Sequence, residues 1–338
     1  MNSKARVLAA VAHRQPDRVP VDYGAHPEVN RRVREYLGLA DDNQLIAAIE
    51  PDLRGVGPSI KWQASPICYA DPTREVTPDG LYIDLWGVGF RRATIPTGDY
   101  IDIAYHPLAD LQSDEELDAH EYMNPDDWDY SGVRAAAEAN ADFAVWAHSR
   151  GTFEISWFIR GLEGFMTDLA LEPRRACGLM DRVQERLKER LRRTLQAGGD
   201  ALDIAEYNDD VATQRGLMMS PEMWRKYLKP RVAEMFDLIR SFGLHVRYHS
   251  CGGVREILPD LIDIGLEILT PFQPLAEGMD PAGLKRDFGR HLTFHGGIDE
   301  QQLLPYSSAD KVRDEVKRLM DIMNEDGGWI ACASHNLQ

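Results

Sequence analysis

The residues with the clearest chemical potential are a histidine and a cysteine one position apart, His249 and Cys251, in the segment 248–253 (YHSCGG). Alternate residues of a β-strand point to the same side, so the imidazole and the thiolate can reach one ion. Cys332 supplies a second thiolate if the fold brings a later strand beside the first. One histidine and two cysteines suit Zn²⁺, and three protein ligands leave the open position of a catalytic zinc site.

Another interpretation of the two cysteines stays open. Free cysteines are often small buried apolar side chains, and a histidine and a cysteine at this spacing are weak evidence alone. If His249 faces the interior, Arg247 does too and needs a carboxylate partner. Glu206 is predicted either as that partner or as a fourth zinc ligand.

Other polar side chains follow the predicted strands. Asp209 and Asp210 are predicted as acid/base groups, with helix capping or a salt bridge as the alternative. Asp299 either caps the next helix or acts on a substrate, and His335 is predicted to act in the site because it lies three residues after Cys332. Substrate binding is assigned to Gln273, Asn336, Gly252 and Gly253, the two glycines because they allow a tight turn and a close approach to a ligand.

The elements that must position these residues alternate from residue 142 onward. Strands are expected at 142–147, 201–207, 245–250, 268–272, 292–295 and 329–333. Helices are expected from Pro173 to Gly198, after the cap Ser220, from Val254, at 281–288 and at 309–325. Alternating strands and helices predict a parallel sheet with crossover helices. No glycine-rich dinucleotide or phosphate motif follows a strand, and the polar clusters follow strand ends, which together favour a (β/α)8 TIM barrel.

The first 140 residues are less regular. A strand is expected at 18–23, and 81–96 indicates a hairpin around Gly87 and Gly89. We interpret this region as the start of the barrel with insertions. The chain is therefore predicted to form one barrel domain, 1–338, with an irregular part, 1–140, and a regular part, 141–338.

Composition limits the classes of partner. The formal net charge of −17 argues against binding a nucleic acid, whose phosphates need a basic surface. No run approaches the roughly 20 apolar residues of a membrane span. Cys68, Cys177, Cys251 and Cys332 lack compact disulfide-like spacing, so a cytoplasmic location is expected.

At its polar clusters the chain resembles the uroporphyrinogen decarboxylase-like superfamily. The segments 249–253 (HSCGG), 294–299 (FHGGID) and 334–336 (SHN) are similar to superfamily motifs. Further segments are similar to the methyltransferase branch of that superfamily: 207–210 (YNDD), 214–216 (QRG), 220–224 (SPEMW) and 153–157 (FEISW) with Arg160 and Gly161. The likeness is specific from residue 141 onward and loose before it.

That resemblance implies zinc on His249, Cys251 and Cys332, and transfer of a methyl group between a corrinoid protein and a small donor or acceptor. The donor or acceptor is a thiol, a methoxy compound or tetrahydrofolate. Cobalamin is expected on a separate protein, since the sequence has no D-x-H-x-x-G motif. The resemblance also implies a possible homodimer and a final helix after His335 and Asn336, which is expected to be missing because the chain stops at Gln338.

Two alternatives to methyl transfer remain. The first is a metal-free decarboxylase or lyase of the same fold, but decarboxylases carry a motif like R-Q-A-G-R-Y where 19–26 here reads VPVDYGAH. The second is a non-catalytic binding or scaffold protein for a corrinoid partner. Fold alone does not decide among these, so the choice rests on the site.

Overall fold

The computed structural model describes residues 1–64, 72–95 and 98–337, so that Cys68, Pro96 and Gln338 lie outside the described residues. By compactness the chain divides into two units. Unit 1 comprises Met1–Val56, Arg134–His148 and Gly198–Gln338, and unit 2 comprises Gly57–Val133 and Ser149–Ala197. These boundaries differ from the predicted change of character at residue 140, and the single domain stays a prediction.

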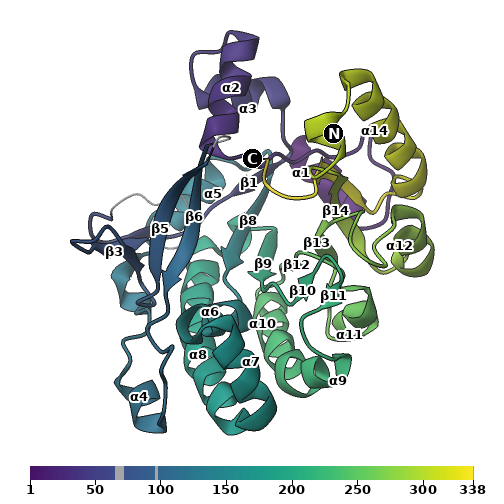
Figure 1. The fold of residues 1–338 in the computed structure, drawn as a ribbon. Helices are drawn as coiled ribbons and strands as arrows, with labels where there is room; N and C mark the ends of the chain where they lie inside the picture. Colours follow the sequence, from purple (N-terminus) through teal and green to yellow (C-terminus); the bar gives the residue numbers. More distant parts are fainter. Residues whose placement is uncertain (65–71, 96–97, 338) are drawn as a thin grey trace. The chain divides into compact units, whose positions relative to one another are not determined.

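Unit 1 is built on a seven-stranded sheet in the order β1-β8-β9-β12-β13-β14-β15 (Figure 1). The strands are β1 Leu53–Gly55, β8 Ala144–Ser149, β9 Ile204–Asn208, β12 His245–His249, β13 Ile268–Phe272, β14 Thr293–Ile298 and β15 Trp329–Ala333. The helices that connect the later strands include α10 Lys229–Ser241, α11 Leu258–Asp263, α12 Pro281–Phe288 and α14 Ala309–Met323. The pairings of defined register are parallel, as the alternation of strands and helices predicts.

Further helices and a small ladder complete unit 1. They are the helices α1 Ser3–Val11, α2 Pro27–Leu37, α3 Asp42–Ile49, α5 Val133–Glu138, α9 Pro221–Met223 and α13 Leu303–Tyr306, the one-turn helices Gly199–Ala201 and Arg255–Ile257, and the small ladder of β10 Ala212–Thr213 with β11 Gly216–Leu217.

A short segment near the amino terminus joins the two edge strands. The backbone N–H of Ala331 in β15 donates to the carbonyl of Pro20, and that of Asp22 donates back to Ala331. On the other side, the N–H of Asp52 donates to the carbonyl of Val21. Residues 20–22 thus take the place of the eighth strand and close the barrel. The predicted strand 18–23 is reduced to isolated bridges at Val21 and Ala25, because Pro20 has no N–H to donate to a ladder.

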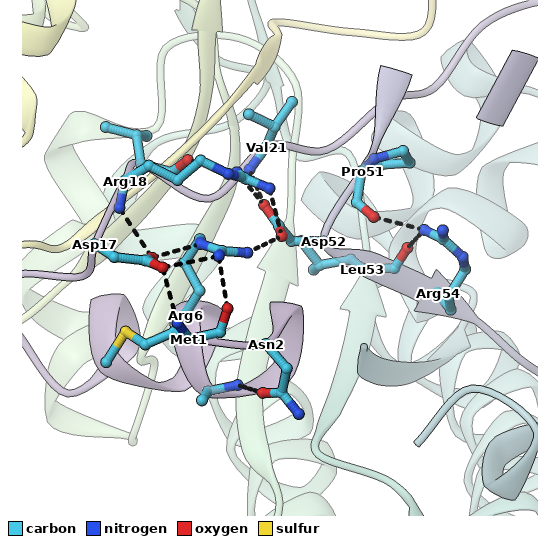
Figure 2. Close-up of polar contacts among 12 residues, drawn as sticks. Met1, Asn2, Arg6, Asp17, Arg18, Val21, Pro51, Asp52, Leu53 and Arg54 are labelled. Atoms are coloured by element: carbon cyan, nitrogen blue, oxygen red, sulfur yellow. Dashed lines mark hydrogen bonds and ion pairs between the residues drawn. The ribbon is translucent and has the colours of Figure 1, made fainter. Parts of the chain in front are cut away.

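Buried ion pairs fix this closing segment (Figure 2). Both carboxylate oxygens of Asp52 accept hydrogen bonds from Arg18, and one also accepts from Arg6 Nη1 at 2.7 Å. The backbone N–H of Val21 donates to the same carboxylate at 2.8 Å. Burial alone would raise the pKa of Asp52, but these donors outweigh it and the pKa is lowered. The carboxylate therefore remains charged and ties Val21 to the start of β1.

An apolar layer fills the amino-terminal end of the barrel. It consists of Leu53, Ala144, Ile204, Ile268 and Ile330 from five strands, with Val7 and Val11 of α1 packed in the same cluster. Barrel interiors are filled in such layers, and the polar side chains that follow along each strand then face the opposite end. On β12 the alternation is clear, because Tyr248 packs against Phe236 of α10, with ring centroids 5.9 Å apart, whereas Arg247 and His249 line a cavity.

Unit 2 contains a four-stranded antiparallel sheet and a group of helices. The sheet is formed by β3 Thr73–Val76, β4 Tyr82–Asp84, β5 Gly89–Ile95 and β6 Gly98–Tyr105, and the short strands β2 Ser59–Ile60 and β7 Trp128–Asp129 pair separately. The helices are α4 Asp114–Ala119, the one-turn helix Pro125–Asp127, α6 Thr152–Arg160, α7 Leu162–Leu171 and α8 Pro173–Gly198. The hairpin predicted around Gly87 and Gly89 is confirmed as β4 and β5.

One predicted helix is interrupted. Ser220 caps its start, accepting from the N–H of Met223 as expected. After α9, however, the chain forms a π-helix, Trp224–Leu228, before α10 begins. Pro230 lies at the start of α10 and cannot donate the backbone hydrogen bond that a continuous α-helix requires there.

No helix in the described part of the chain is long and apolar enough to cross a membrane.

Candidate active site

A cavity of about 680 Å³ lies within unit 1, a size typical of small-molecule sites. Five residues predicted for the site line it: Glu206, His249, Cys332, His335 and Asn336. Their side chains come from β9, β12, β15 and the segment after β15. The sequence thus places residues from distant segments at one end of the barrel, as expected for side chains that follow parallel strands.

His249, Cys251 and Asp210 form a group that can hold a metal ion. Cys251 Sγ lies 3.7 Å from His249 Nε2, and Asp210 Oδ1 lies 3.8 Å from the same nitrogen. The ligand atoms of the three residues all lie within 4.8 Å of one another. In a tetrahedral zinc site with bonds of about 2.0 and 2.3 Å, nitrogen and sulfur are about 3.6 Å apart. The spacing and the chemistry of these donors therefore fit Zn²⁺.

The local backbone explains this spacing. β12 ends at His249, so Cys251 lies just past the strand rather than on it. Its backbone N–H donates to Asp210 Oδ1 at 2.8 Å, which fixes the loop beside the carboxylate. Asp210, predicted as an acid/base group, thus lies beside the two residues predicted to bind zinc.

Cys332 lines the cavity from β15 but is not a member of this group of three. Burial, and then the negative charge of Asp22, raises the pKa of the Cys332 thiol well above its usual value. Its Sγ lies 3.0 Å from the carbonyl oxygen of Ala333, to which the thiol donates. Cysteine binds a metal as the thiolate, so binding here would displace the proton.

Glu206 contacts Arg247 directly. The two residues are Cα partners across β9 and β12, and Arg247 Nε lies 2.7 Å from Glu206 Oε2. Burial favours a raised pKa for Glu206, but the charge of Arg247 outweighs it and lowers the pKa. The structure therefore brings together the ion pair that was one of the two predictions for Glu206, and its role as a metal ligand stays a prediction.

The loop that holds Cys251 is braced by Gln273. Its Oε1 accepts from the N–H of Gly252 at 2.9 Å and from Gln214, and its Nε2 donates to the carbonyl of Ser334. Gly252 has φ +87°, and a Cβ there would lie 2.4 Å from a backbone oxygen. A Cβ on Gly253 would lie 2.8 Å from another. These three residues pack against neighbouring loops, and none of them lines the cavity formed by the described residues.

Two predicted acidic residues have structural partners. Asp299 accepts hydrogen bonds from the N–H groups of Gln301, Gln302 and Leu303, which caps α13. Asp209 is buried and accepts from the hydroxyl of Tyr207 at 3.1 Å. The capping alternative for Asp299 is thus realised, and catalytic roles for both remain predictions.

His335 lies close to the metal-binding group. Its ring is 6.5 Å from that of His249, centroid to centroid, in an edge-on arrangement. Asn336 follows it along the cavity lining. This position allows His335 to exchange a proton with a molecule bound beside His249, as a general acid or base must.

Five charged or titratable residues of the cavity were not predicted from the sequence: Asp22, Tyr23, Arg54, His148 and His295. His295 Nε2 lies 3.1 Å from Asp22 Oδ2, and both side chains are largely buried. Burial would raise the pKa of Asp22, but its hydrogen bond with His295 outweighs this and lowers the pKa. For His148 and His295 the available signal was their position at the end of a predicted strand, since 142–147 directly precedes His148 and 292–295 ends at His295.

Together these features define an α/β barrel with a polar, donor-rich cavity at one end. Residues 95–338 match the uroporphyrinogen decarboxylase (URO-D) family, and the chain belongs to that family.

Similar proteins refine the comparison. The methylcobamide:CoM methyltransferase MtaA of Methanosarcina barkeri is 30% identical over 123 residues, which are 36% of this chain and 33% of that protein. The same enzyme of strain Fusaro / DSM 804 is 28% identical over 123 residues, with the same coverage. The match thus spans about a third of the length of these relatives. A methyltransferase structure from Methanosarcina mazei covers 100% of this chain and 94% of its own at a TM-score of 0.65, and at 17% identity it supports the fold alone.

Proposed function

We propose that the protein is a zinc-dependent methyltransferase that moves a methyl group between a corrinoid protein and a small methyl donor or acceptor. The observation that carries this proposal is the 3.7 Å spacing of His249 Nε2 and Cys251 Sγ at the cavity, with Asp210 beside them. The partial similarity to MtaA supports a thiol as the acceptor, because CoM is named as that enzyme's substrate. A methoxy compound and tetrahydrofolate remain the alternatives.

In this proposal His249, Cys251 and Cys332 hold the zinc, and Asp210, rather than Glu206, would occupy the fourth position until a substrate displaces it. Bound zinc would supply Lewis acidity that lowers the pKa of a thiol or activates a leaving oxygen. Asp210 or His335 would accept the substrate proton. Asn336 would contact the substrate from the cavity wall, and the following residues are proposed to position the loops around it: Asp209, Gly252, Gly253, Gln273 and Asp299.

The first test is the metal content of protein purified without added metal. We expect about one zinc per chain, lost in Cys251→Ala and in Cys332→Ala. Cys177→Ala is the matched control, because Cys177 lies on α8 in unit 2. Zinc-free wild type, or full zinc retention in Cys251→Ala, would remove the proposed mechanism.

The second test is methyl transfer with free methylcobalamin in place of the corrinoid protein. Loss of methylcobalamin absorbance on addition of CoM, and its absence in Cys251→Ala, would support a thiol acceptor. Turnover with tetrahydrofolate alone would redirect the assignment of the acceptor.

A metal-free lyase is the second candidate, favoured by the arginines Arg54 and Arg247 in the cavity lining. Arginine-lined cavities suit substrates with several carboxylates. Release of CO₂ from uroporphyrinogen by zinc-free protein would establish that activity instead.

A further inference from the structure

Arg247 is a buried cation whose hydrogen bonds are incomplete. Its exposed fraction is 2%, and it forms an ion pair with Glu206 in which Nε lies 2.7 Å from Oε2. Within the described part of the chain, neither Nε nor Nη1 has a partner in hydrogen-bond geometry. Arginine usually meets a carboxylate with two parallel hydrogen bonds, and buried donors are nearly always paired. One edge of this guanidinium is therefore left for an acceptor from elsewhere.

The side chain is also held rigidly. Its guanidinium carbon lies 3.9 Å from the centre of the Trp146 ring, over the indole face. Both residues line the cavity. Glu206 on one edge and Trp146 on one face fix the plane of the guanidinium, so an acceptor that reaches Nη1 meets a pre-oriented donor.

The second arginine of the cavity differs. Arg54 Nη1 donates to the carbonyls of Pro51 and Leu53 at 2.8 and 2.7 Å, and its guanidinium lies over the Phe143 ring. Backbone carbonyls thus accept from Nη1 of Arg54, whereas Nη1 of Arg247 has no hydrogen-bond partner among the described residues. This contrast makes Arg54 a matched control.

Arg247 also has a defined position relative to the metal-binding group. It lies two residues before His249 on β12, and both side chains line the same cavity. Alternate residues of a strand are about 6.7 Å apart. A molecule that contacts both residues must therefore carry its two functional groups within a few bonds of each other.

We propose that Arg247 binds the anionic group of the substrate, and that the substrate is a short-chain carboxylic or sulfonic acid bearing the reacting thiol or methoxy group. The inference rests on the proposed function, since it assigns the reacting group to the neighbourhood of His249. Glu206 orients Arg247 in this arrangement, and Trp146 shields the ion pair from water.

The test compares two anionic thiols with a neutral thiol of similar size. Calorimetric titration of zinc-loaded protein would use 3-mercaptopropionate, 2-mercaptoethanesulfonate and the neutral methyl 3-mercaptopropionate. We expect at least one acid to bind about tenfold or more tightly than the ester, as a charge-assisted hydrogen bond implies. The preferred acid distinguishes carboxylate from sulfonate. Equal affinity of the acids and the ester would overturn the proposal.

Variants locate the effect. Arg247→Lys keeps the charge beside Glu206 but loses the planar fork, so the preference for the acid should fall about tenfold or more. Arg54→Lys should leave the preference unchanged, and Glu206→Gln should keep or increase it. Loss of the preference in Arg54→Lys but not in Arg247→Lys would refute the assignment.

A ligand without a thiol separates this inference from the proposed function. Propane-1-sulfonate and butyrate can be titrated into metal-free protein, beside the neutral butyramide. If an alkyl acid binds wild type in preference to butyramide but not Arg247→Lys, the anion site stands even if no methyl transfer is found. If methyl transfer proceeds with equal kcat/KM for the acid and ester thiols, the anion site is wrong while the function stands.

Discussion

Asp52 is the acidic residue on which closure of the barrel depends (Figure 2). Its buried carboxylate binds Arg6, Arg18 and the backbone of Val21. Asp52→Asn removes the charge but keeps the shape, so Arg18 and the buried Arg6 lose the carboxylate that they share, and Arg6 keeps the partly exposed Asp17. We expect a loss of about 3–5 kcal/mol in the free energy of unfolding, measured by urea denaturation.

Asp17→Asn is the control for this variant. Asp17 also contacts Arg6, but its side chain is 43% exposed, so water can replace it and the loss should be much smaller. Because folding lowers the pKa of Asp52, its contribution is present above the unfolded pKa and declines as the pH falls through the folded one. Equal losses in both variants at neutral pH would contradict the role given to Asp52.

A second titratable pair, His245 and Glu267, makes the free energy of unfolding depend on pH. The pair's contribution is lost both at high pH, through the histidine, and at low pH, through the glutamate. His245 Nδ1 lies 2.8 Å from Glu267 Oε1, a contact that raises the pKa of His245, and folding lowers the pKa of Glu267 although burial opposes this. The histidine's contribution is full below its unfolded pKa of about 6.5 and is lost as the pH rises through the raised value. The glutamate's contribution is lost as the pH falls through its lowered pKa.

His245→Gln should therefore destabilise the protein by less than about 1 kcal/mol between these limits, since the pair is partly exposed. The difference from wild type should shrink as the pH rises above the folded pKa of His245. NMR titration of His245 checks the direction of its shift. A His245 pKa below about 6.5 would contradict the predicted pH dependence.

At the scale of elements, the contact between β13 and β14 depends on a residue without a side chain. Gly297 has φ +97°, and a Cβ there would lie 2.1 Å from the ring of the fully buried Phe272. Gly297→Ala should cost more than about 2 kcal/mol of unfolding free energy, from the clash and the left-handed backbone together. Gly38→Ala isolates the backbone cost, because Gly38 has φ +69° with nothing within 4 Å of a Cβ. If chemical denaturation gives similar losses of unfolding free energy for Gly297→Ala and Gly38→Ala, the ring of Phe272 moves away from the new Cβ and the predicted clash is wrong.

The elements also show why the sequence predicts some features and not others. The bounds of β13, α12 and β15 agree with the prediction, because each has a continuous local pattern of its own. The pairing of Glu206 with Arg247 was one of the two predictions for Glu206, because Arg247 shares a strand face with His249 and needs a carboxylate partner.

The contact between Asp22 and His295 was not predictable in the same way. Asp22 belongs to the closing segment, whose position depends on backbone bonds to both edge strands rather than on its own pattern. The proximity of Asp210 to Cys251 likewise depends on a loop conformation held by one backbone N–H. Such contacts come from the register of distant segments, which local periodicity does not encode.

At the scale of the whole molecule, the proposed metal site and cavity belong to unit 1 alone. Their residues come from all three stretches of that unit, which are separated in sequence by the stretches of unit 2. A metal ion bound by β12 and β15 would therefore link segments of the barrel that are distant in the chain. Binding that requires the folded state stabilises that state by mass action.

Zinc should accordingly slow hydrogen exchange in a defined part of the chain. At free zinc of 100 times the dissociation constant, the stabilisation is about 2.7 kcal/mol, or roughly a hundredfold slower exchange through openings that break the site. Amides of β9, β12 and β15 should show it, while those of β4 and β5 in unit 2 should not. Mass spectrometry with and without a chelator gives the map, and Cys251→Ser is the control that should show no zinc-dependent change. Equal protection in that variant would mean that zinc binds elsewhere, because the sulfur and nitrogen donors beside the cavity would then be unnecessary.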